Sequence, residues 1–160
     1  VDGLHIKSGI PEKKIAEIAN MINLRKDNVR VVLVAGPSAS GKTTFSKRLG
    51  VQLAVNGLKP YQISLDNYFV DRKLTPLDEQ GNYDFESLGA IDIEFFNDQL
   101  KELLKGEEVQ LPKFDFTHGR RYLNGPRLQL QKNDILVVEG IHGMNPGLLP
   151  EIDDKNLFKM

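Results

Sequence analysis

The stretch Gly36-Pro-Ser-Ala-Ser-Gly-Lys-Thr43 decides the fold, because it fits the pattern G-x-x-x-x-G-K-[ST] between a predicted strand and a predicted helix. Before it, the β-branched apolar run of residues 29–35 predicts a buried parallel strand. After it, apolar residues recur at helical spacing over residues 43–55. A glycine loop between a strand and a helix turns its backbone N–H groups toward a phosphate chain. The sequence therefore predicts a phosphate-binding loop.

The same loop contains the residues that we expect to hold a nucleotide. Gly36 and Gly41 permit backbone conformations that a side chain would obstruct. We expect Lys42 to reach the β- and γ-phosphates and the Thr43 hydroxyl to ligate Mg²⁺. The full predicted binding set, which surrounds the phosphates largely through backbone N–H groups, is Gly36, Ser38, Ala39, Ser40, Gly41, Lys42, Thr43 and Thr44.

The composition excludes several classes of protein and site. A chain of 160 residues suffices for one domain with a hydrophobic core. Its net charge of −1 argues against a nucleic-acid-binding protein with a broad basic face. The absence of cysteine removes disulfides, thiolate nucleophiles and thiolate zinc sites. The apolar runs are too short for a membrane span and no signal peptide is visible, so we expect a cytoplasmic protein without a membrane partner, as a monomer or a homo-oligomer.

Helical and extended patterns alternate along the chain. An apolar face over residues 15–22 predicts a helix that ends near residue 28, and a similar face predicts another helix over residues 91–105. Apolar runs at residues 60–65 and 134–139 predict two further central strands, and residues 157–160 resemble the start of a fourth. This alternation predicts an α/β fold, a three-layer α/β/α arrangement of P-loop NTPase type with a mostly parallel sheet. Ligands are expected at the carboxyl ends of its strands.

A second kind of pattern lies between the last helix and the third central strand. Residues 109–116 and 127–130 alternate apolar and polar side chains on either side of Asn124-Gly125-Pro126. They predict an antiparallel β-hairpin that turns at residues 124–126 and is appended to the sheet. We divide the chain into an N-terminal helix over residues 1–28, a candidate linker from an upstream domain, and a P-loop core over residues 29–160.

Two acidic residues stand at the carboxyl ends of predicted strands, at the edge where the phosphate loop also lies. Glu139 closes the run Ile135-Leu-Val-Val-Glu139, where P-loop proteins place the acid that handles Mg²⁺ directly or through water. Asp66 follows the strand at residues 60–65 and is placed to accept a proton from an attacking hydroxyl or to hold the metal. Either carboxylate could instead cap a turn. The pair indicates phosphoryl transfer, which needs positioning, Mg²⁺ and a few cations.

Five segments in a fixed order resemble one family of kinases. They are Gly36-Pro-Ser-Ala-Ser-Gly-Lys-Thr43, Ser64-Leu-Asp-Asn-Tyr68, Tyr83-Asp84-Phe85, Pro112-Lys-Phe-Asp-Phe116 with His118 and Arg120, and Val138-Glu-Gly140. In this order and spacing the chain is similar to the uridine kinase and phosphoribulokinase family over residues 29–160. The phosphate loop is common to many NTPases, whereas the other segments are more selective.

This resemblance implies ATP- and Mg²⁺-dependent phosphorylation of a small-molecule hydroxyl, commonly the 5′-hydroxyl of a ribonucleoside. By the same resemblance Asp66 is the general base, with Lys42 also catalytic, and Thr43, Glu139 and Asp66 are the metal-site residues. Asp84 corresponds to an aspartate that binds sugar hydroxyls. The resemblance further implies that the family's active-site lid would follow residue 160, so we expect this chain to bind Mg²⁺–ATP but to transfer phosphate slowly.

The predicted acceptor pocket departs from the family pattern. Phe114 stands where nucleoside kinases have a tyrosine beside the base, and a phenylalanine cannot donate a hydrogen bond. The segment Phe116-Thr-His118 is one residue shorter than that pattern, so His118 is either a substrate contact or a solvent-facing residue. Arg120 and Arg121 are placed to attract an anionic substrate, or are simply exposed charges of the hairpin.

Other functions are compatible with parts of the sequence. A GTPase reading rests on Asp78-Glu-Gln-Gly81, but this D-x-x-G stretch lies in a polar loop and no Asn-Lys-x-Asp signature accompanies it. An ATPase without an acceptor, a noncatalytic ATP-binding fragment, and a kinase of a phosphorylated sugar or a pantothenate-like alcohol stay open as alternatives. Turnover of ATP that no acceptor affects would favour the ATPase.

Overall fold

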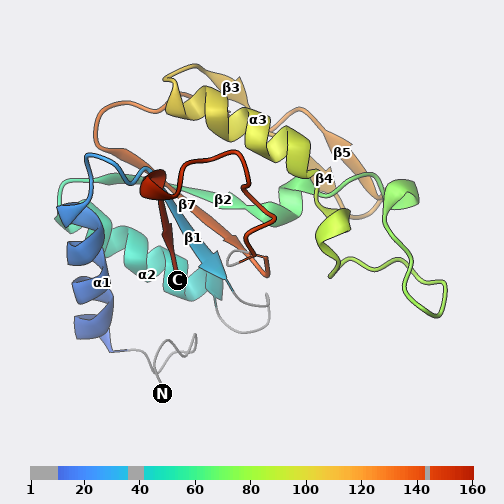
Figure 1. The fold of residues 1–160 in the computed structure, drawn as a ribbon, viewed down its shortest axis with the longest axis horizontal. Helices are drawn as coiled ribbons and strands as arrows, with labels where there is room; N and C mark the ends of the chain where they lie inside the picture. The colour runs from blue at the N-terminus through green and yellow to red at the C-terminus, as the bar shows by residue number, and fades with distance from the viewer. Residues whose placement is uncertain (1–10, 36–41, 143–144) are drawn as a thin grey trace. The chain divides into compact units, whose positions relative to one another are not determined.

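The computed structural model describes residues 11–35, 42–142 and 145–160, with the helix but not the side chains of residues 42–44. The chain divides into two units. The first comprises Val1–Ile63, Gln131–Asn145 and Asp153–Met160, and the second comprises Ser64–Leu130 and Pro146–Ile152. Figure 1 follows the described elements from the N-terminus, in blue, to the C-terminus, in red.

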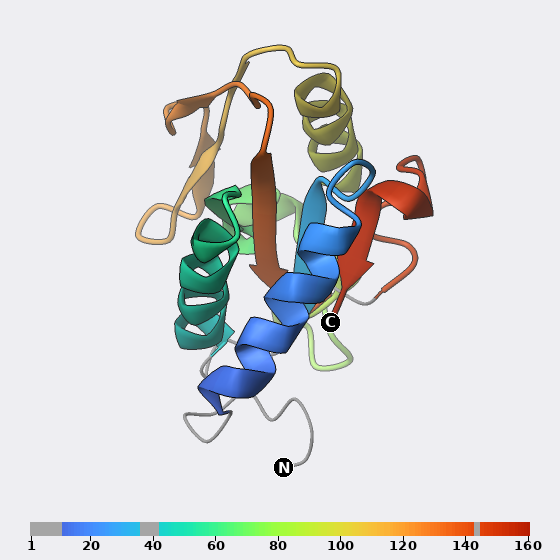
Figure 2. The ribbon, with the colours of Figure 1, turned by 90° about the vertical axis from the view of Figure 1, so that its left-hand side faces the viewer.

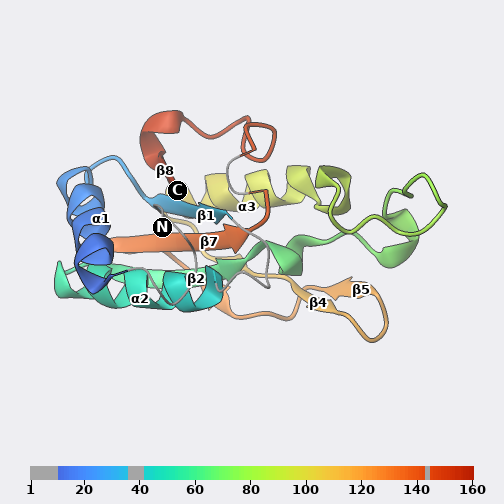
Figure 3. The ribbon, with the colours of Figure 1, turned by 90° about the horizontal axis from the view of Figure 1, so that it is seen from below.

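The first unit is built on a four-stranded, mostly parallel sheet with the strand order β2-β7-β1-β8. Its strands are β1 (Val31–Ala35), β2 (Lys59–Ser64), β7 (Asp134–Gly140) and β8 (Leu157–Lys159). β1 pairs in parallel with β7 on one side and with β8 on the other (Figure 3). The α/β class and the strands predicted at residues 29–35, 60–65, 134–139 and 157–160 are confirmed.

Two helices cover one face of this sheet (Figure 2). They are α1 (Glu12–Leu24) and α2 (Lys42–Val55). The apolar residues of both helices form one buried cluster with side chains from β1 and β7, namely Ile15, Ile18, Ala19, Ile22, Phe45, Leu49, Leu53, Val32, Val34, Ile135 and Val137. Because each fully buried aliphatic side chain stabilises a fold by about 1.5–3 kcal/mol, α1 is an integral part of this core.

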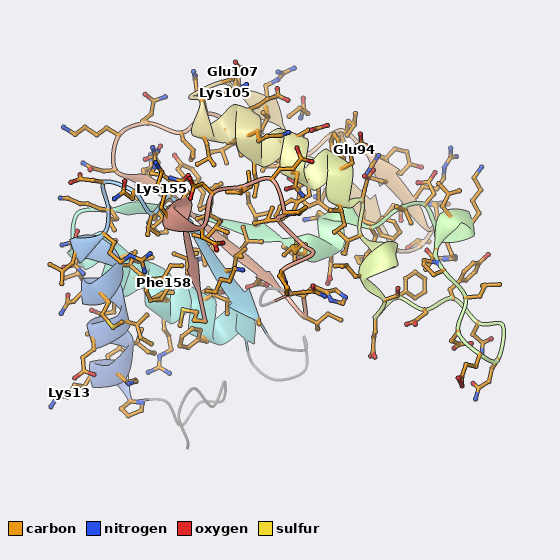
Figure 4. The ribbon with its side chains drawn as sticks, in the orientation of Figure 1. Lys13, Glu94, Lys105, Glu107, Lys155 and Phe158 are labelled. Carbon is orange, nitrogen blue, oxygen red and sulfur yellow. The ribbon has the colours of Figure 1, made fainter. Side chains whose placement is uncertain are left out.

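Polar contacts also join α1 to its neighbours. Glu12, in the first turn of α1, accepts hydrogen bonds from Arg48 at 3.0 Å and from Gln52 at 2.7 Å, both on α2. At the other end of α1, the Arg25 guanidinium lies 5.6 Å from the ring centroid of Phe158 on β8. Figure 4 labels Phe158, and Lys13 on the exposed side of α1. The helix ends at Leu24, whereas the sequence predicted an end near residue 28. Residues 25–28 form hydrogen-bonded turns in place of a further turn of α-helix.

The second unit contains one α-helix and two short antiparallel ribbons. The helix is α3 (Ile93–Leu104), whose first turn is capped by the Asp92 side chain accepting the Phe95 N–H at 3.1 Å. The ribbons pair β3 (Val109–Gln110) with β6 (Arg127–Leu128), and β4 (Lys113–Asp115) with β5 (Arg120–Tyr122). Nowhere in the described part of the chain is a helix long and apolar enough to cross a membrane.

The position of the hairpin turn corrects the sequence prediction. The chain reverses at residues 116–119, between β4 and β5, and both ribbons are separate from the four-stranded sheet. Gly119 has φ 64°, a left-handed conformation that suits glycine at such a turn. Gly125 instead lies in the segment between β5 and β6 and donates its N–H to the Leu111 carbonyl at 2.9 Å. A Cβ at Gly125 would lie 2.6 Å from that oxygen, so glycine here permits close pairing and not a turn.

Candidate active site

Strand pairing places Glu139 beside the end of β1. In the parallel register Val34 faces Glu139 and Ala35 faces Gly140. The predicted phosphate loop begins one residue after β1, at Gly36. Gly36, Ser38, Ala39, Ser40 and Gly41 lie outside the described residues, while Lys42, Thr43 and Thr44 open α2. Glu139 therefore lies near the carboxyl end of β7, beside the end of β1 after which the predicted phosphate loop begins.

Ser46 links Glu139 to the start of α2. The Ser46 side chain is fully buried, and its hydroxyl donates to Glu139 Oε2 at 2.7 Å. The backbone carbonyl of Ser46 in turn accepts the side-chain amide of Gln62, on β2, at 3.2 Å. Because Ser46 follows Lys42 by one helical turn, these bonds fix the first turns of α2 to β7 and β2. The sequence analysis did not single out Ser46, since a lone serine among apolar helix positions gives no signal of its buried partner.

The Glu139 environment suits a hard divalent cation. Magnesium prefers oxygen ligands and usually takes one or two carboxylates together with phosphate oxygens and water. Glu139 supplies a half-buried carboxylate beside a serine hydroxyl. Among the described residues no group of three or more histidine, cysteine, aspartate or glutamate side chains gathers as a metal site. A carboxylate and a hydroxyl are oxygen donors of the kind that Mg²⁺ takes.

Replacing Ser46 with alanine tests the role of this hydroxyl. The variant removes one donor to the Glu139 carboxylate, so we expect the Kd for Mg²⁺–ATP to rise about 3- to 10-fold, the size of one typical net hydrogen bond. Isothermal titration calorimetry measures the change. Ser87→Ala, which removes a turn acceptor in the second unit, is the matched control and should leave this Kd unchanged. An equal Kd for Ser46→Ala and the wild type would show that the bond does not position Glu139.

Asp66 lies in a short 3₁₀ turn directly after β2. The turn, η2, spans Leu65–Tyr68, and its N-cap is Ser64, whose hydroxyl accepts the Asp66 N–H at 3.2 Å. The Asp66 side chain is half-buried and follows the last residue of β2 by two positions. The predicted strand-end acid is thus held in a defined helical turn and not in an irregular loop.

The two residues after Asp66 fasten this turn to other elements of the second unit. Asn67 Oδ1 accepts the backbone N–H of Phe114, on β4, at 3.2 Å. The buried Tyr68 hydroxyl donates to Gln99 Oε1 on α3 at 2.6 Å, and Gln99 Nε2 donates to the Gln110 carbonyl at 2.7 Å. Burial raises the pKa of the Tyr68 phenol well above its ordinary value, so the hydroxyl stays a donor. These hydrogen bonds attach the turn that contains Asp66 to β4 and to α3.

The predicted acceptor residues Asp84 and Phe114 have different surroundings. Asp84 Oδ1 accepts the Glu86 N–H at 3.1 Å, so its carboxylate shapes its own turn. Phe114 is 6% exposed and packs edge-on against Phe69 and Phe116, with ring centroids 5.5 and 4.9 Å away. These rings and those of Tyr83 and Phe85 form one aromatic cluster. Asp84 lies between Tyr83 and Phe85 in the sequence, so it shares this region with Phe114.

His118 lies in the turn between β4 and β5, and Arg120 is the first residue of β5. Asp115 Oδ1 accepts the N–H groups of Thr117 and His118, and its Oδ2 lies 2.6 Å from His118 Nδ1. Arg120 faces Asp115 across the ribbon. Arg121, in contrast, is bound within the unit, because its guanidinium donates to Asp92 Oδ2 at 2.7 Å and lies over the Phe95 ring. Of the two arginines, Arg120 is the exposed one.

The Asp115 carboxylate gives the turn a pH dependence. Hydrogen bonds from His118 hold the pKa of Asp115 below its ordinary value of 3.8. A lowered folded-state pKa stabilises the turn above that ordinary value, and the contribution is lost as the pH falls through the lowered pKa. We expect the amide signals of Thr117 and His118 to shift cooperatively below about pH 4 in NMR spectra. Asp115→Asn should remove this transition, and its persistence in the variant would assign it to another group.

Sequence and structure comparisons identify the family. Residues 31–151 match the model of the phosphoribulokinase / uridine kinase family. The chain belongs to this family. A uridine kinase of Ligilactobacillus salivarius is 28% identical over 134 residues, which cover 84% of this chain and 61% of that protein. Inorganic pyrophosphatase TTM2 of Arabidopsis thaliana is 29% identical over 140 residues, covering 87% of this chain and 19% of that protein.

A solved structure has the same fold. A possible uridine kinase from Bacillus stearothermophilus superposes with a TM-score of 0.69 at 23% identity, over 88% of this chain and 77% of that one. The family thus accounts for the mostly parallel sheet with its helices. The chain spans 61% of the length of the Ligilactobacillus relative and 53% of that of a uridine kinase of Halobacterium salinarum.

Proposed function

We propose that this protein transfers the γ-phosphate of ATP to a hydroxyl group of a small molecule, with a nucleoside as the first candidate. The observation that carries the proposal is the register of β1 with β7, which sets Glu139 beside the strand end that leads into Gly36 and the phosphate loop. The Ser46 bond to Glu139 supports it, because that bond joins the same carboxylate to the helix that follows the loop. The nucleoside is favoured by the relatives named uridine kinase.

In the proposed mechanism the loop residues Gly36 to Thr44 bind the phosphates. Lys42 offsets the negative charge of the transferring group, and Thr43 and Glu139 hold the Mg²⁺. When bound, Mg²⁺ would neutralise part of the negative charge of the transferring phosphate. These residues position and charge-stabilise the phosphoryl group, which is most of what such a transfer requires.

Asp66 is the proposed general base. Its carboxylate, in the turn that follows β2, would accept the proton of the acceptor hydroxyl as the oxygen attacks phosphorus. Asp84, Phe114, His118 and Arg120 are the proposed acceptor residues. Since Phe114 is buried among other rings, we assign it to shaping the pocket wall, and the exposed rings of Tyr83 and Phe116 to contact with a planar group.

Asn67 should set the position of β4 relative to Asp66. Asn67→Ala removes the acceptor for the Phe114 N–H, so we expect the KM for the acceptor to rise about 3- to 10-fold with a smaller change in the KM for ATP. Asn67→Asp keeps a side-chain oxygen at this position and should restore most of the loss. Steady-state kinetics with each substrate varied separately measures both constants. A rise in both KM values alike would indicate general destabilisation.

An acceptor panel tests the proposed function. The whole protein is incubated with Mg²⁺–ATP and, in separate reactions, uridine, cytidine, ribose and pantothenate, and ADP formation is followed. We expect ADP to form several-fold faster with at least one nucleoside than without an acceptor. Equal ADP formation in every reaction would favour an ATPase over a kinase.

A further inference from the structure

Arg121 joins the ribbon of β4 and β5 to the start of α3 (Figure 1). It is the middle residue of β5, its Nη1 donates to Asp92 Oδ2 at 2.7 Å, and its Cζ lies 4.6 Å from the ring centroid of Phe95. We propose that Arg121 is a positioning residue, which acts with Asp92 to fix this ribbon relative to Asp66. The inference rests on the proposed kinase function, because the ribbon contains three of the proposed acceptor residues.

Arg121 is held through its backbone as well as its side chain. Its N–H donates to Asp71 Oδ1 at 3.0 Å. The side chains of Arg121 and Asp92 are only 25% and 28% exposed, so water screens their ion pair less than it screens a pair on the surface. A charge-assisted hydrogen bond in such a place is stronger than a neutral one, and the aromatic ring below the guanidinium adds a cation–π attraction. Three contacts from one residue therefore hold β5.

Asp92 connects Arg121 to the turn that contains Asp66. Its second carboxylate oxygen, Oδ1, accepts the Phe95 N–H and caps α3. The Asp92 N–H donates to the Tyr68 carbonyl at 2.8 Å, and Tyr68 is the last residue of the η2 turn. A single residue thus links the guanidinium on β5 to the turn of the proposed general base.

The two strands of the ribbon are fastened separately. Phe114 on β4 lies directly opposite Arg121 on β5. The Phe114 N–H donates to Asn67 Oδ1, one residue after Asp66, while Arg121 is bound to Asp92. With the Arg121 anchor removed, the ribbon keeps the Asn67 bond but can rotate about it. Because a displacement of about 1 Å can cost about 100-fold in rate, such a shift would move the acceptor hydroxyl out of reach of the base.

Two single variants remove the ion pair from either side. Asp92→Ser keeps a side-chain oxygen that caps α3 but is too short to reach Arg121. Arg121→Met keeps an unbranched side chain over Phe95 but has no donor. Arg127→Met is the matched control, because Arg127 on β6 lies 3.5 Å from Glu108 and both of these side chains are more than half exposed.

Hydrogen exchange of backbone amides, measured by NMR on the whole protein without substrates, is the first readout. We expect Asp92→Ser and Arg121→Met to speed exchange at residues 114 and 121 at least about tenfold, and exchange in β3 and β6 less than about twofold. Arg127→Met should leave exchange in β4 and β5 unchanged. Unchanged exchange at residues 114 and 121, or an equal rise in both ribbons, would overturn the proposal.

Steady-state kinetics with the best acceptor is the second readout. We expect both variants to raise the KM for the acceptor at least about tenfold, the size of a hydrogen bond between charged groups, while the KM for ATP stays within about twofold. Since the two side chains act as a pair, Asp92→Ser/Arg121→Met should lose no more than the worse single variant. An equal rise in the two KM values, or single losses that multiply in the double variant, would contradict a positioning role.

The two readouts separate this inference from the proposed function. Exchange needs neither ATP nor an acceptor, so it reports on the Arg121–Asp92 pair whether or not the protein is a kinase. A wild-type protein that phosphorylates no acceptor would refute the proposed function and, with it, any role of the pair in positioning an acceptor. Faster exchange at residues 114 and 121 would then show an anchor of the ribbon alone.

Discussion

Asp66→Asn is expected to lower the rate of phosphoryl transfer at least about 100-fold, the usual contribution of a positioned general base. The amide keeps the size of the side chain but cannot take up the proton of the acceptor hydroxyl. The Asp66 N–H bond to Ser64 and the anchors at Asn67 and Tyr68 do not involve the carboxylate, so the turn should be preserved. The kcat of the whole protein with its best acceptor measures the loss.

Binding of ATP separates loss of the base from loss of the site. We expect the Kd of Asp66→Asn for Mg²⁺–ATP to stay within about threefold of the wild-type value, because the loop residues and Glu139 are unchanged. Asp98→Asn, an exposed change on α3, is the matched control and should keep full activity. Undiminished transfer by Asp66→Asn would remove Asp66 from the mechanism.

Glu139→Gln is expected to weaken the dependence of ATP binding on Mg²⁺ by about 10- to 100-fold, as for the loss of a group that positions a metal. The amide oxygen still accepts the Ser46 hydroxyl, so the variant removes charge with little change of shape. Calorimetry measures the Kd for ATP without Mg²⁺ and the Kd with Mg²⁺. The first Kd divided by the second should fall in the variant, while the Kd for metal-free ATP stays the same.

A matched change elsewhere controls for net charge. Glu107→Gln replaces an exposed glutamate near the end of α3 (Figure 4) and should not alter the ratio. If Glu139→Gln and Glu107→Gln both leave the Mg²⁺ dependence intact, Glu139 does not handle the metal.

The central sheet was predictable because its strands carry strong local signals. Residues 31–34 and 134–138 are buried without interruption, and runs of that kind are typical of parallel strands covered on both faces. Hydrophobic patterns do not encode which strands pair, so they do not predict that β1 lies beside β7. Strand ends differed by one or two residues, as expected where hydrogen bonding and not side-chain pattern sets the boundary.

The second unit was less predictable because long-range contacts decide it. Asn124-Gly125-Pro126 contains the usual turn residues, yet the chain turns where Asp115 accepts two backbone N–H groups and Gly119 adopts φ 64°. The buried polar residues Asn97 and Gln99 on α3 gave no sequence signal either, because their partners lie in other elements. Side chains that bond across more than about ten residues are invisible to periodicity.

The candidate site was predictable where a motif and a strand end coincide. Glu139 and Asp66 are candidates proposed in this way, and the register of β7 sets Glu139 opposite Val34, near the end of β1. Ser46 and Asn67, which position these acids or their surroundings, were not found. Their roles depend on single hydrogen bonds to Glu139 and Phe114, and a serine or asparagine is more often an exposed residue or a cap.

Phosphorus NMR of the reaction tests the central claim most directly. The whole protein is mixed with Mg²⁺–ATP and uridine, and the phosphorus signals are followed over time. We predict that a new phosphate monoester signal grows in step with ADP, and that both disappear when Mg²⁺ is removed or Asp66 is replaced by asparagine. Growth of inorganic phosphate alone, at a rate that neither uridine nor any other hydroxyl compound changes, would contradict the account.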